Sequence, residues 1–171
     1  MQIIETGRLA LSELSLEDAP FIMELVNEPD WLRFIGDRGV RNLDDARGYI
    51  QKGPMDMYAR LGFGLYKVAL KADGTPLGMC GLLKRDSLPD ADIGFAFLAR
   101  YRGRGYAREA AEATLAYARG SCGLKRILAI TSPDNQRSIG LLQKLGFSYE
   151  KTVQLSADGG ESKLFVLDPA G

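Results

Sequence analysis

The chain contains no histidine. This absence excludes catalytic triads and dyads that use an imidazole base, and metal sites with imidazole ligands. Neither sign of charge is in excess, because 22 lysines and arginines balance 22 aspartates and glutamates. A zero net charge with a pI near 6.3 gives no global attraction to nucleic acid or to an anionic membrane. We therefore expect neither nucleic acid nor membrane as a partner.

Cysteine is scarce as well, and two residues are too few for a disulfide framework. Cys80 lies in an apolar run and is interpreted as a small buried hydrophobic residue, and Cys122 lies in a loop. No apolar run approaches the roughly 20 residues of a membrane span. The N-terminus lacks the basic flank and apolar stretch of a signal peptide. These absences predict a cytoplasmic location.

The chain has 171 residues, 46% of them hydrophobic and 26% charged. Single domains commonly have about 100–200 residues, and this composition is ordinary for a globular protein. A chain of this size can bury about 70% of its unfolded surface, so it needs no disulfide or metal to fold. We expect residues 1–171 to form one domain.

Hydrophobic periodicity predicts an α+β domain built around a sheet, in the order β-α-α-β-β-β-α-β-α-β-β. Residues 30–39 are expected as a loop, and the Asp73-Gly74 pair predicts a hairpin. A second turn is expected around Asp158-Gly159-Gly160. The predicted strands are at about 8–14, 64–70, 76–84, 91–98, 126–131, 147–155 and 162–167, and the helices at about 15–29, 42–53, 106–119 and 133–146.

A glycine-rich turn, residues 100–108, lies between a predicted strand and a predicted helix. Glycine lets the backbone approach a ligand without a Cβ in the way. The start of the helix adds unpaired N–H groups and the positive end of the helix dipole. Together these features can hold a phosphate or pyrophosphate. Three arginines add positive charge: Arg102, Arg104 and Arg108.

This turn alone is compatible with several structures. A dinucleotide-binding turn needs G-x-G-x-x-G, but Arg108 occupies the third glycine position. The P-loop pattern G-x-x-x-x-G-K-[ST] is absent. A tight strand–helix turn with arginines facing water is the structural alternative, and a generic nucleotide-binding domain is the functional one.

Four segments resemble one family, in the same order along the chain. Residues 102–107, RGRGYA, resemble the R/Q-x-x-G-x-G/A acyl-CoA pyrophosphate motif of the GNAT superfamily of N-acetyltransferases. Residues 135–147 resemble the N-x-x-S-x-x-L-x-x-K-L-G-F segment of its ribosomal-protein N-terminal acetyltransferase branch, which includes RimJ and RimL. Residues 7–19 and 91–95 also resemble that branch. The resemblance covers nearly the whole chain.

The resemblance implies a GNAT-like fold, with a mixed sheet of about seven strands splayed at the middle and about four flanking helices. It implies direct transfer of an acetyl group from acetyl-CoA, the cosubstrate, to a primary amine without a metal. The expected acceptor is a protein N-terminal α-amine or a small-molecule amine, and we expect the protein to be a monomer or a homodimer. A non-catalytic acyl-CoA-binding or regulatory module is the alternative, favoured by Leu142 where many relatives carry a tyrosine acid.

The resemblance also assigns the residues that bind the cofactor. The backbone of Phe95 and Phe97 would bind the pantetheine arm, and Asn135 would contact the same arm. From the residues alone, the two phenylalanines could be plain core and Asn135 a helix N-cap. The pyrophosphate would be held by the N–H groups of Arg102, Gly103, Arg104, Gly105, Tyr106, Ala107 and Arg108.

For catalysis, Asp92 matches the acidic position of A-[DE]-I-G-[FY] and is the candidate base. Its alternative is a surface carboxylate at a strand edge. Ser138 matches a serine that lies near the CoA sulfur in one branch of the family. Its alternative is a small polar residue early in a helix. Tyr106 and Tyr149 are further candidates for the acid.

The segment between the first two helices covers the acceptor side in relatives, and it contains Trp31, Arg33, Phe34 and Arg38. These residues are therefore expected in the acceptor pocket, although Trp31 could also be a core residue. Residues 84–89 are expected to form another wall. Glu109 and Glu112 are expected on the solvated face of their helix.

Overall fold

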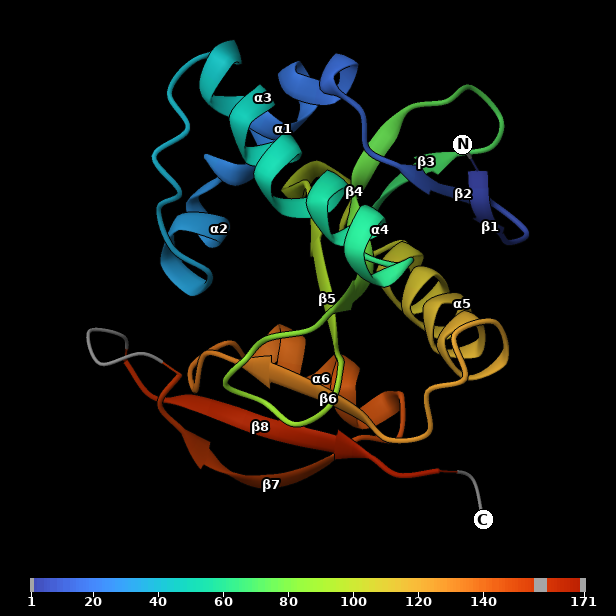
Figure 1. The fold of residues 1–171 in the computed structure, drawn as a ribbon, viewed down its shortest axis with the longest axis vertical. Coiled ribbons are helices and arrows are strands. Elements are labelled where there is room, and N and C mark those ends of the chain that lie inside the picture. Colours follow the sequence, from blue (N-terminus) through green and yellow to red (C-terminus); the bar gives the residue numbers. More distant parts are fainter. Residues whose placement is uncertain (1, 156–159, 170–171) are drawn as a thin grey trace.

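The structure is a computed structural model that describes residues 2–155 and 160–169. One sheet runs through it in the strand order β1-β2-β3-β4-β5-β6-β8-β7 (Figure 1). The strands are β1 (Gln2–Glu5), β2 (Leu9–Glu13), β3 (Leu65–Leu70), β4 (Pro76–Leu83), β5 (Asp92–Phe97), β6 (Ile127–Thr131), β7 (Ser148–Val153) and β8 (Ser162–Leu167).

Helices cover both faces of this sheet. The helix α5 packs its small residues, among them Ala110 and Ala111, against β2 to β5, which allows a close approach of helix and sheet. On the opposite face, α1 and α3 pack around Met79 of β4. The helices are α1 (Ala19–Val26), α2 (Pro29–Phe34), α3 (Leu43–Ile50), α4 (Asp56–Leu61), α5 (Tyr106–Gly120) and α6 (Gln136–Lys144), with short turns at Leu16–Asp18, Gln51–Met55 and Ala99–Tyr101.

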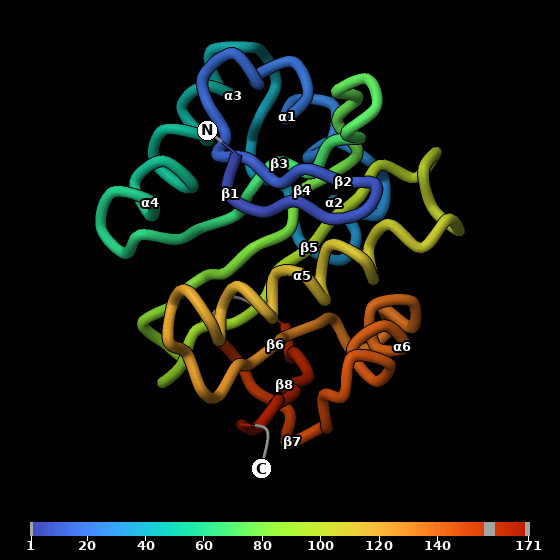
Figure 2. Tube along the Cα trace, turned by 90° about the vertical axis from the view of Figure 1, so that its right-hand side faces the viewer, coloured from blue at the N-terminus to red at the C-terminus, as the bar shows by residue number. Residues whose placement is uncertain are grey.

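The sheet is splayed between β5 and β6. Strands β4 and β5 pair along their whole length, from Gly78↔Phe97 to Leu83↔Asp92. By contrast, the parallel strands β5 and β6 share one pair, Asp92↔Leu128, and then separate. Figure 2 shows the result, with β1 to β4 grouped above and β6 to β8 grouped below. The sheet therefore opens at its middle, as predicted.

The open edge of β5 presents free backbone groups. The carbonyl of Ala91 accepts a hydrogen bond from the N–H of Leu128 at 2.9 Å, so it points towards β6. Backbone groups of alternate residues in a strand point to the same side. The N–H and C=O groups of Phe95 and Phe97 therefore face the gap, where no described residue of β6 pairs with them.

Two turns show the local chemistry of their residues. The N–H of Ser15 donates to the Asp18 carboxylate at 2.9 Å, as expected for a capping box. Gly74 adopts a φ of +77° in the hairpin between β3 and β4. In the turn expected around Asp158-Gly159-Gly160, Asp158 and Gly159 lie outside the described residues.

The structure also corrects the predicted elements. Residues 30–39 are not simply a loop, because Pro29 starts α2 at a position where its missing N–H is not needed. The second predicted helix does not end at Pro54, which lies inside a π-helical turn that leads into α4. Strand β1 was not predicted; it pairs antiparallel with β2. No helix among the described residues is long and apolar enough to cross a membrane.

Candidate active site

Two cavities meet where β5 and β6 separate. The larger has a volume of about 900 Å³ and the smaller about 710 Å³. Seven residues line both cavities, so groups bound in the two cavities lie next to each other. The residues that line both are Trp31, Phe34, Ile35, Phe95, Ala96, Asn135 and Ser138.

The smaller cavity gathers the residues expected to bind acetyl-CoA. It extends from the open edge of β5 to the start of α5. Of the ten residues predicted for the cofactor, Arg104 alone does not line this cavity. The residues present are Phe95, Phe97, Arg102, Gly103, Gly105, Tyr106, Ala107, Arg108 and Asn135.

The glycine-rich turn forms a row of free amides. Gly103 and Gly105 have φ values of +80° and +79°, a region that favours glycine. The first N–H of α5 that donates within the helix belongs to Glu109, which bonds the carbonyl of Gly105 at 3.1 Å. Within the described part of the chain, the N–H groups of residues 103–108 have no hydrogen-bond partner. Such a row at a helix start fits a pyrophosphate.

One predicted amide is not available. The N–H of Arg102 donates to the carbonyl of Ala99 at 3.2 Å, because it caps the turn Ala99–Tyr101. Carboxylates also reduce the positive charge of this region. Arg102 pairs with Asp30 at 2.5 Å, and Arg108 pairs with Glu112 at 2.8 Å. The backbone amides and the helix dipole therefore carry most of the attraction for an anion here.

The larger cavity is the candidate acceptor cleft. Trp31, Phe34 and Arg38, which were expected in the acceptor pocket, line this cavity, and Arg85 forms part of another wall. Trp31 is also a core residue with 6% exposure. Arg33 is placed differently. It lines neither cavity, and its guanidinium pairs with Asp134 at 3.3 Å.

Asp92 lies at the point where β5 and β6 separate and lines the larger cavity. It is not a surface carboxylate, because its exposure is 1%. Arg85 is its ion-pair partner, with 3.3 Å between Nε and Oδ1. Burial raises the pKa of Asp92 to about 6, although Arg85 lowers it in part. At neutral pH this carboxylate is mostly ionised and can accept a proton.

Asn135 and Ser138 belong to the first turn of α6. The Asn135 side chain accepts from the N–H of Ser138 at 3.3 Å, which makes Asn135 the N-cap. Both residues also line the two cavities. The Ser138 hydroxyl has no hydrogen-bond partner among the described residues and is free for a ligand. Leu142, one turn further on, is buried at the wall of the larger cavity.

The remaining predicted residues differ in where they lie. Tyr149 is 52% exposed and lines neither cavity, whereas Tyr106 lines the smaller one. Glu109 is not simply solvated, because its side chain is 23% exposed and bonds Arg8. Two residues near the site were not predicted from the sequence: Arg8, and Tyr49, which lines the larger cavity. Among the described residues, no cluster of three or more acidic or cysteine side chains could hold a metal.

Comparison with known proteins identifies the family. Residues 8–148 match the acetyltransferase (GNAT) domain. An uncharacterized N-acetyltransferase of Bacillus subtilis, YnaD, is 28% identical over 86% of this chain and 83% of its own length. A GNAT-family acetyltransferase from Bacillus anthracis superposes with a TM-score of 0.80 at 25% identity, covering 98% of both chains.

A more distant structure has the same fold with a bound ligand. RimL, a ribosomal L7/L12 alpha-N-protein acetyltransferase in complex with coenzyme A, has a TM-score of 0.72 at 14% identity, and the match covers 99% of this chain and 98% of RimL. GNAT proteins use acetyl-CoA, and the row of amides and the open edge of β5 described above fit that molecule. The chain therefore belongs to the GNAT family and is an acetyl-CoA-dependent acetyltransferase.

Proposed function

We propose that this chain transfers the acetyl group of acetyl-CoA directly to a primary amine, with Asp92 as the base. The observation that carries the proposal is the position of Asp92, buried where β5 and β6 separate and on the wall of the acceptor cleft. The smaller cavity holds the cofactor. In it, the amides of residues 103–108 bind the pyrophosphate, and the backbone of Phe95 and Phe97 binds the pantetheine arm.

Acetyl-CoA supplies an acetyl thioester, whose carbonyl carbon is open to attack by a neutral amine. Asp92 accepts a proton from the amine nitrogen as the new C–N bond forms, either directly or through a water molecule. The C–S bond then breaks, and the sulfur leaves with its electron pair. Ser138, which lines both cavities, donates a hydrogen bond to this sulfur. With Leu142 at the usual tyrosine position, the serine hydroxyl takes over this task.

The pKa of Asp92 favours acceptors that lose a proton readily. An α-amine has a pKa near 8, whereas a lysine amine has a pKa of about 10.4. A base with a pKa of about 6 deprotonates the α-amine with the smaller free-energy cost. A protein N-terminus or a small α-amine therefore fits this site better than a lysine side chain. RimL, which has the same fold, is a ribosomal L7/L12 alpha-N-protein acetyltransferase, which supports the same choice of acceptor.

The experiment is a screen of amines with detection of free thiol. The panel contains amino acids, short peptides with a free N-terminus, the same peptides with a blocked N-terminus and a free lysine, and polyamines. We expect CoA release with at least one unblocked α-amine and little with the blocked peptides. Binding of acetyl-CoA in calorimetry without CoA release for any amine would instead indicate a non-catalytic acyl-CoA-binding module.

A further inference from the structure

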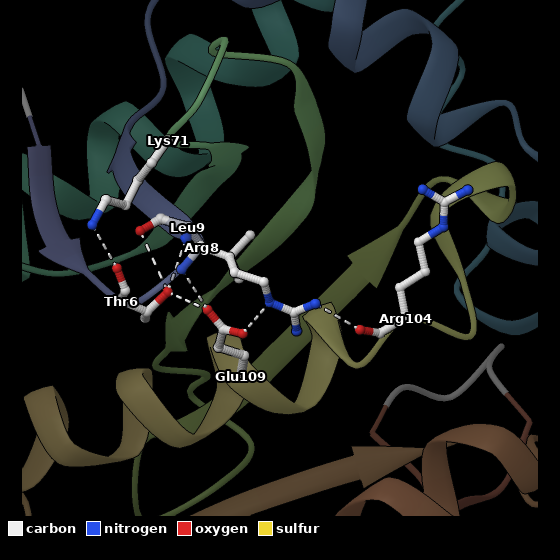
Figure 3. Close-up of polar contacts among 6 residues, drawn as sticks. All are labelled: Thr6, Arg8, Leu9, Lys71, Arg104 and Glu109. Atoms are coloured by element: carbon white, nitrogen blue, oxygen red, sulfur yellow. Dashed lines mark hydrogen bonds and ion pairs between the residues drawn. The ribbon is translucent and has the colours of Figure 1, made fainter.

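Arg8 lies just before β2, about one hundred residues before the free amides of residues 103–108. In the fold, its side chain contacts the turn that carries these amides. Its Nε–H donates to the Glu109 carboxylate at 2.7 Å, and its Nη1–H donates to the Arg104 carbonyl at 3.0 Å. The guanidinium also lies over the ring of Tyr106, 4.5 Å from the ring centre. Figure 3 shows Arg8 extended between Glu109 and the Arg104 carbonyl, while the Arg104 side chain points away.

Glu109 fixes Arg8 from the first turn of α5. One carboxylate oxygen accepts from the Arg8 Nε–H, and the other accepts from the Arg8 backbone N–H at 3.0 Å and from the Thr6 hydroxyl at 2.5 Å (Figure 3). The Lys71 ammonium in turn donates to the Thr6 carbonyl at 2.9 Å. The end of the β1–β2 hairpin is thus tied to the start of α5 by charge-assisted hydrogen bonds.

We propose that Arg8 is a positioning residue for acetyl-CoA binding, and that with Glu109 it holds the turn at residues 103–105 in the conformation that presents its amides to the pyrophosphate. The inference rests on the proposed function of residues 103–108. Gly103 and Gly105 give this turn wide conformational freedom. A turn that is already ordered in the free protein loses less entropy when the ligand binds.

Arginine is suited to this task in a way that lysine is not. Its planar group donates in two directions at once, here to a carboxylate and to a carbonyl, while its face covers Tyr106. The Nη2 group takes part in neither of these two hydrogen bonds. It lies 3.4 Å from the position that a Cβ on Gly105 would occupy. A lysine would keep the positive charge but could not make both hydrogen bonds together with the ring contact.

The test compares Arg8→Met, Arg8→Lys and Glu109→Gln with the wild type and with Arg60→Met. Arg60 forms an exposed pair with Asp56 on α4, away from both cavities, and is the matched control. We expect Arg8→Met to raise the Kd for CoA and the KM for acetyl-CoA about tenfold, with kcat within about twofold of the wild type. Arg8→Lys should bind nearly as weakly, and Arg60→Met as tightly as the wild type.

Adding Glu109→Gln to Arg8→Met should weaken binding little further, because both act through one network. Wild-type affinity in Arg8→Lys would overturn the inference, since charge alone would then suffice. An equal loss of kcat and affinity, or a loss that follows thermal stability alone, would also overturn it.

A second measurement needs no ligand and separates this inference from the proposed function. Hydrogen exchange of the free protein is read at the Glu109 N–H, which bonds the carbonyl of Gly105 and is therefore protected only while the turn keeps its conformation. We expect faster exchange there in Arg8→Met and Glu109→Gln, and no change in Arg60→Met. Unchanged exchange would contradict the network, whatever the ligand. A wild type that binds no CoA but shows the exchange effect would contradict the cofactor assignment and leave the ordering of the turn intact.

Discussion

The carboxylate of Asp92 lies 3.3 Å from the Nε of Arg85, at the wall of the acceptor cleft. The two partners differ in environment, because Asp92 is 1% exposed and the Arg85 side chain is 36% exposed. Burial and the ion pair therefore act on the carboxylate in opposite directions. Burial is the stronger, so the pKa of Asp92 rises to about 6. This balance places the group where it can exchange protons near neutral pH.

Arg85→Met should move the acid side of the pH–rate profile to higher pH. Arg85 lowers the pKa of Asp92 through its charge and its hydrogen bond, so without Arg85 the pKa rises above 6. The base is then protonated, and inactive, over a wider range. The measurement is kcat/KM against pH with one amine. Arg126→Met, at similar exposure but paired with Glu150, should leave the profile in place. A profile that Arg85→Met does not move would contradict the role of Asp92.

Asp92→Asn should lower kcat and yet stabilise the fold above pH 6. The pKa of Asp92 is higher in the folded state than its usual value of 3.8, so its ionisation opposes folding. This cost is small at pH 4, grows as the pH rises through 6 and is complete above about pH 7, where it is about 3 kcal/mol. Urea unfolding of the wild type and of Asp92→Asn at pH 4, 6 and 8 measures this difference in the free energy of unfolding. Asp56→Asn, the same substitution on the surface of α4, is the control. A less stable Asp92→Asn at pH 8 would contradict the argument.

Gly105→Ala should weaken acetyl-CoA binding, and Gly62→Ala should not. Both glycines have nearly the same positive φ, +79° and +78°, so both substitutions should cost about 1 kcal/mol of folding stability. Gly105 lines the cofactor cavity and Gly62 does not, and a Cβ on Gly105 would lie 3.4 Å from the Arg8 Nη2. Calorimetry with CoA and thermal unfolding measure the two effects. Equal affinities for the two variants would show that the turn does not contact the ligand.

Ser138→Ala should lower kcat about tenfold with little change in stability. The hydroxyl has no partner among the described residues, and the residue is held in α6 by its backbone N–H, which bonds Asn135 at 3.3 Å. The loss should be smaller for a thioester with a more acidic thiol, which leaves without help. Ser148→Ala on the exposed face of β7 is the control. Wild-type kcat in Ser138→Ala would remove the serine from the mechanism.

Features set by local chemistry could be predicted from the sequence. The positive φ of Gly74 and Gly105 follows from turns that favour glycine, and the capping role of Asn135 follows from its place before α6. Proline was less informative, because it can end one helix or start the next. Pro29 starts α2, although the sequence pattern suggested only the end of α1.

Features that depend on distant contacts could not be predicted from residue patterns. Glu109 has the spacing of a solvated helix position, and only the folded chain brings Arg8 to it from 101 residues away. Arg33 follows the same rule, since its pairing with Asp134 directs it away from the acceptor cleft. Asp92 likewise has neighbours that its own strand does not reveal, because it pairs with Leu128 of β6 and with the side chain of Arg85.

The central claim is direct acetyl transfer to an amine. It is tested most directly by measuring CoA thiol, acetylated amine and the intact mass of the protein in one reaction, with the best amine from the screen. We predict equal amounts of CoA and N-acetylated product, no acetylated protein before the amine is added, and a much slower reaction in Asp92→Asn. An acetylated protein that passes its acetyl group to the amine, or acetyl-CoA left intact with every amine, would contradict the account.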